Sequence, residues 1–147
     1  MKYSKATNHA LHTMVYLTMI QTGKTIGVQS LGEIQEVSPA YLSKILTKLV
    51  KAGLIESTPG VNGGYKLTKN AKEISFLDVI TAIEGNASLF NCAIEHEELI
   101  NSKNCLIEDV MDEAEQQMKN HLEKQLIKDV ANRFDEERLR FIESKSS

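Results

Sequence analysis

The chain has 147 residues, of which 41% are hydrophobic and 25% are charged, a balance typical of one compact domain with at most an appendage. It excludes a fibrous or disordered chain, and the absence of any apolar run near the roughly 20 residues that span a bilayer argues against membrane insertion. The formal net charge is only −3. Two cysteines are too few for a disulfide-stapled secreted scaffold, so we expect a cytoplasmic protein.

The first third of the chain predicts helices. Apolar residues recur at helical spacing from Lys5 to Ile20, which predicts a first helix packed on a core. Ser30 and Glu33 have the spacing of a capping box, in which each side chain bonds the other residue's backbone amide. We therefore expect a short second helix that begins at Ser30 and ends near Gln35.

A third helix is predicted to begin at Pro39, because Ser38 is a good N-cap and proline is tolerated at the first helical position. Gly53 provides the C-terminal stop. One face of this helix is apolar, and the other carries Ala40, Tyr41, Ser43, Lys44, Thr47, Lys48 and Lys51. Two short helices joined by a tight turn match a helix-turn-helix, whose second helix reads DNA.

Two strands are expected next, at residues 54–58 and 64–67, around a turn rich in glycine at residues 59–63. A hairpin after a recognition helix forms a wing. Residues 75–84 predict a further amphipathic helix, which Gly85 and Asn86 end. Residues 87–104 show no clear period.

A long helix is predicted from Leu106, where an apolar stripe continues for some six turns. Its members are Ile107, Val110, Met111, Ala114, Met118, Leu122, Leu126 and Val130. A small domain covers so long a stripe poorly, so pairing with a second copy is expected, and the alternative is that the helix folds back on its own domain. Residues 133–147 are charged and not assigned, with possible anchors at Phe134, Leu139, Phe141 and Ile142.

Charge is divided unevenly along the chain. Residues 1–72 contain nine lysines and three acidic residues, a net charge of +6, and the remainder carries −9. A basic N-terminal part attracts a polyanion such as nucleic acid, although charge also segregates by chance on a solvated surface. The sequence contains no phosphate-binding glycine loop and no nucleophile elbow, so we do not expect an enzyme. A winged-helix module that contacts only proteins is the other alternative, and the basic half disfavours it.

Four segments together resemble the Rrf-two family of bacterial winged-helix transcription regulators. They are Ser38-x-x-Tyr41-Leu42, Gly53-Leu54-Ile55, Gly60-x-x-Gly63-Gly64-Tyr65-x-Leu67, and Ile74-Ser75-x-Leu77-x-Val79-Ile80-x-Ala82-Ile83-Glu84-Gly85. The resemblance covers roughly residues 1–130. It implies a mainly α fold with a small β-hairpin wing: a winged helix-turn-helix domain (1–85), a sensing loop (86–104), a dimerisation helix (105–131) and a charged C-terminal tail (132–147). It also implies a homodimeric regulator, expected to be a repressor, on a partly palindromic double-stranded DNA operator.

The family's base-reading positions correspond here to Ala40, Tyr41 and Ser43, and only Tyr41 keeps the usual chemistry. The operator sequence is therefore not transferable. Lys44, Lys48 and Lys51 are expected at phosphates, with Asn62 and Lys66 of the wing near the minor groove or backbone, although each lysine is also compatible with a plain surface charge. The candidate DNA-binding set is completed by Ser30, Ser38 and Thr47.

The loop with Cys92 and Cys105 leaves several readings open. Family members that carry an iron–sulfur cluster place three cysteines there, whereas the middle position here falls among His96, Glu97 and Glu98. A cluster then needs other ligands, such as histidine, carboxylate or the partner's Asn8, His9 or His12. Reversible thiol oxidation is the alternative we favour. A single metal on Cys92, His96 and Cys105, or two buried cysteines in a protein controlled by a metabolite or a partner protein, also fit.

Overall fold

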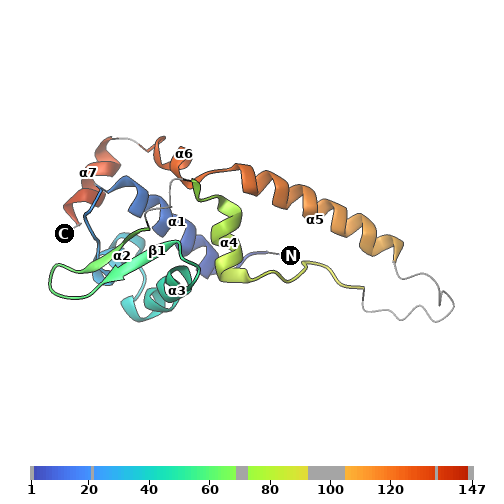
Figure 1. Cartoon of the computed structure of the whole chain (residues 1–147), viewed down its shortest axis with the longest axis horizontal. Helices are drawn as coiled ribbons and strands as arrows, with labels where there is room; N and C mark the ends of the chain where they lie inside the picture. Colours follow the sequence, from blue (N-terminus) through green and yellow to red (C-terminus); the bar gives the residue numbers. More distant parts are fainter. Residues whose placement is uncertain (1, 21, 69–72, 93–104, 135, 146–147) are drawn as a thin grey trace.

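The computed structural model describes residues 2–20, 22–68, 73–92, 105–134 and 136–145. Within these ranges the chain forms seven helices and one antiparallel hairpin (Figure 1). The elements are α1 (Lys5–Met19), α2 (Val28–Gln35), α3 (Pro39–Lys51), β1 (Ile55–Thr58), β2 (Gly64–Leu67), α4 (Phe76–Glu84), α5 (Leu106–Lys124), α6 (Ile127–Ala131) and α7 (Glu136–Ser144). The predicted fold class, mainly helical with a small wing, is confirmed.

Helix α1 is the centre of the core. Ser4 caps it, and Ala10 and Met14 are completely buried. It contacts α3, α4, α6, α7 and β2, so elements from both ends of the chain meet on it. The predicted first helix is therefore confirmed, ending one residue earlier than expected.

Helix α2 begins before the predicted capping box. The backbone N–H of Leu31 already donates to the Gly27 carbonyl, at 3.0 Å, so Ser30 lies inside the first turn and the predicted box with Glu33 is wrong. The helix ends at Gln35 as expected, through Glu36 in the left-handed region. Gly32 permits the tight turn that follows, because an added Cβ would lie 2.8 Å from the Val37 carbonyl oxygen.

Helix α3 follows the sequence prediction closely. The Ser38 hydroxyl accepts from the Tyr41 backbone N–H, at 3.2 Å, and Pro39 occupies the first turn. The buried face consists of Leu42, Ile45, Leu46 and Leu49. Helices α2 and α3 are in contact and form the helix-turn-helix.

The wing is a two-stranded antiparallel sheet in which Glu56 is paired with Lys66 and Thr58 with Gly64. A short bridge attaches it to the body, because Ile26 and Tyr65 exchange backbone hydrogen bonds of 3.0 and 2.8 Å. Gly63 is sterically required at the turn, since an added Cβ would lie 2.0 Å from the Thr58 carbonyl oxygen.

The predicted single helix from Leu106 to Val130 is wrong beyond Lys124. The backbone opens at Gln125 and Leu126 and pairs with the start of α4: Phe76 N–H donates to the Gln125 carbonyl at 2.8 Å, and Ile127 N–H donates to that of Ile74 at 3.0 Å. Ile127 is then buried in the core. The end of the apolar stripe therefore packs on its own domain, through α6.

The C-terminal segment, left unassigned from the sequence, contains α7 and packs against α1. Ile142 is completely buried, and the Arg138 guanidinium donates to the Tyr16 hydroxyl at 3.2 Å. Lys145 forms an ion pair with Glu33 of α2, at 3.1 Å. The last described residues thus help to fix α1 and α2, the two helices that pack against α3.

Helix α5 extends away from this body, and its first turns lie far from the helix-turn-helix (Figure 1). In α5, only Glu115 is buried. In the part of the chain that the structure describes, no helix combines the length and hydrophobicity needed to cross a membrane.

Candidate functional site

The outward face of α3 brings most of the predicted base and phosphate contacts together. Ala40, Tyr41, Lys44, Thr47 and Lys48 are exposed, and Ser43 is half-buried. They lie on one face because the other face packs its leucines and isoleucine into the core. The arrangement offers cations, hydroxyls, a methyl group and a phenol ring on one convex helix surface, which is the chemistry that DNA grooves and phosphates accept.

Tyr41 stands in the first turn of α3 with 38% of its surface exposed. The Ser38 cap holds its backbone, and the ring meets the His9 ring edge-on, with centroids 5.9 Å apart and planes at 85°. Thr47 donates its hydroxyl to the Ser43 carbonyl at 2.9 Å, so toward DNA it would act as an acceptor. Ser30 lies half-buried in the first turn of α2.

Lys48 has an acidic neighbour, Glu84 at the end of α4. The Glu84 carboxylate accepts from the Thr7 hydroxyl at 2.6 Å and from the Ser4 backbone N–H and hydroxyl, both at 2.8 Å. These bonds, the Thr7 bond most of all, lower the pKa of Glu84 below its ordinary value of 4.5, and the Lys48 charge lowers it further. Lys48 therefore lies within electrostatic reach of Glu84.

The two candidate DNA-contacting residues of the wing, Asn62 and Lys66, have different surroundings. Asn62 is exposed next to Val61, and its backbone carbonyl accepts from the Thr25 hydroxyl at 3.1 Å. Lys66 forms an ion pair with its cross-strand partner Glu56, at 3.4 Å. A phosphate contact by Lys66 must replace this pair, which at an exposed site is worth at most about 1 kcal/mol.

The second predicted site, around the cysteines, is only partly visible. Cys92 and Cys105 are half-buried at the two edges of a segment, residues 93–104, that lies outside the described residues and contains His96, Glu97 and Glu98. In the described ranges, no three His, Cys, Asp or Glu side chains converge as a metal site. Two thiols are fewer than a cluster needs, so the described residues do not by themselves fit one.

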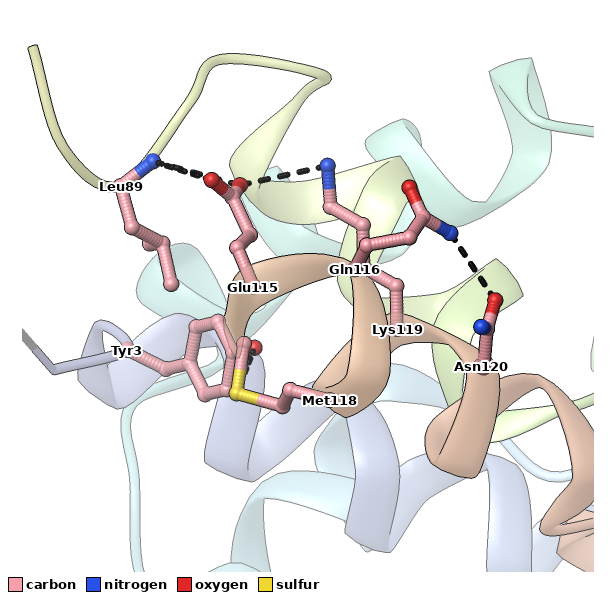
Figure 2. A network of polar contacts seen from close by, with 7 residues as sticks. All are labelled: Tyr3, Leu89, Glu115, Gln116, Met118, Lys119 and Asn120. Atoms are coloured by element: carbon pink, nitrogen blue, oxygen red, sulfur yellow. Dashed lines mark hydrogen bonds and ion pairs between the residues drawn. The ribbon is translucent and has the colours of Figure 1, made fainter. Parts of the chain in front are cut away.

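A polar network connects the segment before Cys92 to α5 (Figure 2). The buried Glu115 carboxylate accepts from the Leu89 backbone N–H, at 3.2 and 3.3 Å, and pairs with Lys119 at 3.2 Å. Nearby, the Tyr3 hydroxyl donates to the Met118 sulfur at 3.7 Å. Met118 thus contacts its own domain, whereas Leu106, Ile107 and Val110 are 81%, 67% and 66% exposed.

Sequence reasoning missed the roles of His9, Glu84 and Glu115. Each contacts a partner far away in the chain: His9 contacts Tyr41, Glu84 contacts Thr7, and Glu115 contacts Leu89. The sequence gives no signal for such pairs. One local signal was readable: Ser75 and Asp78 form the capping box of α4.

A helix-turn-helix with an exposed basic second helix, followed by a β-hairpin, defines the class of winged-helix DNA-binding proteins. The chain belongs to the Rrf2 family, whose model, described as "Iron-dependent Transcriptional regulator", matches residues 3–133. It is thus a DNA-binding transcriptional regulator, and the resemblance inferred from the sequence is confirmed.

Relatives and solved structures agree with this assignment. YffB of Lactococcus lactis, a candidate HTH-type transcriptional regulator, is 37% identical over 120 residues, which cover 78% of this chain and 77% of YffB. The HTH-type transcriptional regulator NsrR of Shouchella clausii is 30% identical over 131 residues, 88% of each chain. The oxidised form of CymR from Staphylococcus aureus superposes with a TM-score of 0.72 at 27% identity, covering 92% of this chain and 99% of CymR.

Proposed function

We propose that this regulator acts as a homodimer that presents α3 of each subunit to a DNA half-site and is switched by oxidation of Cys92 and Cys105. The observation that carries the proposal is the outward face of α3, where Tyr41, Lys44 and Lys48 are all exposed. Because it binds DNA, it acts in the cytoplasm beside its operator, and its role there is regulatory rather than enzymatic.

On DNA, Tyr41 and Ser43 read bases, with Ala40 offering a methyl group. Phosphate groups are contacted by Lys44, Lys48 and Lys51. The interface is completed near the DNA backbone by the hydroxyl groups of Thr47, Ser38 and Ser30. The wing places Asn62 and Lys66 at the neighbouring groove. One half-site offers few contacts, so two subunits on two half-sites of a partly palindromic operator provide the specific affinity.

The dimer is supported by the apolar residues that α5 leaves in water. Leu106, Ile107 and Val110 are more than half exposed on a helix that projects from the body. Each exposed Å² of apolar surface costs roughly 25 cal/mol, so a second copy of the same helix is a favourable cover. Met111 and Met118 of the same helix are half-buried, and Met118 contacts Tyr3 of its own domain.

The switch uses the two thiols that border residues 93–104. A peroxide that accepts two electrons oxidises both thiols to a disulfide and is itself reduced to water or alcohol, and the two thiol protons complete those products. A disulfide would pull residues 86–92 toward the first turn of α5. The Leu89 to Glu115 hydrogen bond connects this segment to α5, which supports a path from the thiols to the dimer.

DNA reading is tested by enriching duplexes from a random library with the wild-type protein and then comparing enriched and scrambled duplexes. Tyr41→Ala should reduce the ratio of the two affinities, losing roughly 1–3 kcal/mol of discrimination. An unchanged ratio would place base reading elsewhere. A salt-independent affinity for every duplex would contradict DNA recognition itself and favour a protein-binding module.

The switch is tested by oxidising the reduced protein with peroxide while free thiols are counted by mass and DNA affinity is measured. Wild type should change affinity with the loss of two thiols, and Cys92→Ser and Cys105→Ser should not respond. Unchanged affinity at full oxidation would discard the thiol switch and leave control by a metabolite or a partner protein. Brown protein with stoichiometric iron and sulfide after anaerobic purification would favour a cluster instead.

A further inference from the structure

A chain of side-chain contacts runs from the core to the exposed end of α3. Thr13 of α1 is completely buried and accepts a hydrogen bond from the Gln35 amide nitrogen at 2.7 Å. The Gln35 amide oxygen lies 3.0 Å from Nδ1 of His9, also on α1. His9 in turn meets Tyr41 edge-on, with ring centroids 5.9 Å apart. The three helices α1, α2 and α3 are thus joined at one point.

The hydrogen bonds fix the His9 ring on one side only. Because Gln35 donates through its nitrogen to Thr13, its oxygen faces His9, and Nδ1 carries the proton in this arrangement. The same imidazole ring lies nearly perpendicular to the Tyr41 ring, at an interplanar angle of 85°. The ring of His9 therefore has a defined orientation before it meets Tyr41.

The Tyr41 side chain depends on such a neighbour for a fixed orientation more than a core side chain does. Its backbone is held by the Ser38 cap, but the residue is 38% exposed, and exposed side chains exchange rotamers quickly unless something packs against them. An edge-to-face aromatic contact favours one of these rotamers. His9 supplies that contact from a different helix.

We propose that His9 is a positioning residue for DNA recognition: anchored by Gln35 and Thr13, it holds the Tyr41 ring in the orientation that reads the operator. This inference rests on the proposed base-reading role of Tyr41. His9 itself acts through Tyr41 rather than through a base, so replacing it changes which orientation Tyr41 adopts without removing the reading group.

The first test uses the free protein, so it does not depend on DNA. In wild type, ring protons of His9 and Tyr41 should show nuclear Overhauser contacts, and three-bond couplings should report a single Tyr41 χ1 rotamer. His9→Ala should give averaged couplings, and His9→Phe should restore most of the preference. A Tyr41 rotamer that is unchanged in His9→Ala overturns the proposal, whatever DNA binding shows.

The second test measures the enriched-to-scrambled affinity ratio for His9→Ala, Tyr41→Ala and the double variant. His9→Ala should lower the ratio by about twofold to tenfold, the range of an aromatic contact, and add nothing to Tyr41→Ala. Base preference should weaken at the same operator positions in both single variants. His12→Ala, on the same helix but facing Tyr16, is the matched control and should leave the ratio unchanged.

Additive effects of His9→Ala and Tyr41→Ala, or a loss at different base positions, would show that His9 does not act through Tyr41 and would overturn the proposal. Failure of DNA reading by Tyr41 and failure of the positioning role of His9 give different results. If wild type enriches no sequence while the Tyr41 rotamer still depends on His9, DNA reading fails and the ring contact stands. If wild type enriches a site and His9→Ala reads it equally well, only the positioning role fails.

Discussion

The carboxylate of Glu115 accepts the backbone N–H of Leu89, at 3.2 and 3.3 Å to its two oxygens, and so joins α5 to the segment that precedes Cys92. The contact spans 26 residues of sequence and includes the one buried side chain of α5. Glu115 therefore ties α5 to the segment that precedes Cys92, whereas Cys105 adjoins α5 directly as its N-cap residue.

We predict that Glu115→Ala releases Leu89. The Leu89 amide should lose its protection against hydrogen exchange, and the free energy of unfolding should fall by about 1–3 kcal/mol, because a hydrogen bond to a charged acceptor is lost. Glu113→Ala, an exposed position on the same helix, is the control and should leave the Leu89 exchange rate unchanged. Equal protection in both variants would contradict the link.

Glu84 should make stability depend on acid pH. Its pKa in the folded protein lies below the ordinary 4.5, because Thr7 and Ser4 donate to it, so its stabilising effect is complete above that value and is lost as the pH falls through the lowered pKa. Urea unfolding at pH 7 and pH 3 should show a smaller loss for Glu84→Gln than for wild type. Glu137→Gln, exposed on α7, should behave as wild type, and equal losses in all three would be evidence against the effect.

The exposed face of α5 predicts a charge-sensitive dimer. Val110→Glu should shift the protein toward monomer in sedimentation at micromolar concentration, because it places a charge in an apolar contact. Gln116→Glu is the matched control, since Gln116 is exposed and lies nine residues from Ile107, about half a turn away in orientation. A fully dimeric Val110→Glu protein would exclude this face as the interface.

Lysine contacts on α3 should differ in their salt dependence. Lys44→Ala should lower the slope of log affinity against log salt by about one unit, as expected for one lost phosphate contact. Lys48→Ala should lower it by less, because Glu84 lies within electrostatic reach of Lys48 and its negative charge opposes a phosphate group at that position. Slopes measured on a scrambled duplex check this order, and a larger effect of Lys48→Ala would reverse it.

The wing should be sensitive to a single methyl group. Gly63→Ala places a Cβ at 2.0 Å from the Thr58 carbonyl oxygen, so the turn must move, at a cost of roughly 2–3 kcal/mol of stability and a loss of DNA affinity. At Gly27 the same change meets no atom of the described residues within 4 Å and serves as the control. Thermal unfolding of the two variants gives the comparison, and equal midpoints would mean that the turn is less constrained than its geometry indicates.

Local signals were enough for much of the fold. Ser38 and Pro39 started α3 as predicted, and the glycines at residues 60–64 marked the wing, because caps and turns depend on neighbours in sequence. The predicted capping box at Ser30 is wrong, because the hydrogen bond from the Leu31 backbone N–H to the Gly27 carbonyl starts α2 about one turn earlier. Helical periodicity alone also predicted that α5 continues past Lys124. In the structure the helix ends there, because Gln125 and Ile127 form backbone hydrogen bonds with Phe76 and Ile74 instead.

The candidate site could be predicted only in part. The exposed face of α3 follows from its helical period, so the sequence identified Tyr41, Lys44 and Lys48 as outward residues. The neighbours of these residues, His9 beside Tyr41 and Glu84 within electrostatic reach of Lys48, come from helices α1 and α4 and depend on tertiary packing. Periodicity carries no information about such neighbours.

Above all, we propose that two subunits read one operator through α3. It is tested most directly by enriching duplexes from a random library and determining the mass of the complex on the enriched sequence. We expect two inverted half-sites and two chains per duplex, with Tyr41→Ala losing preference at matching positions in both halves. A single uninterrupted site bound by one chain, with preference independent of Tyr41, would contradict it.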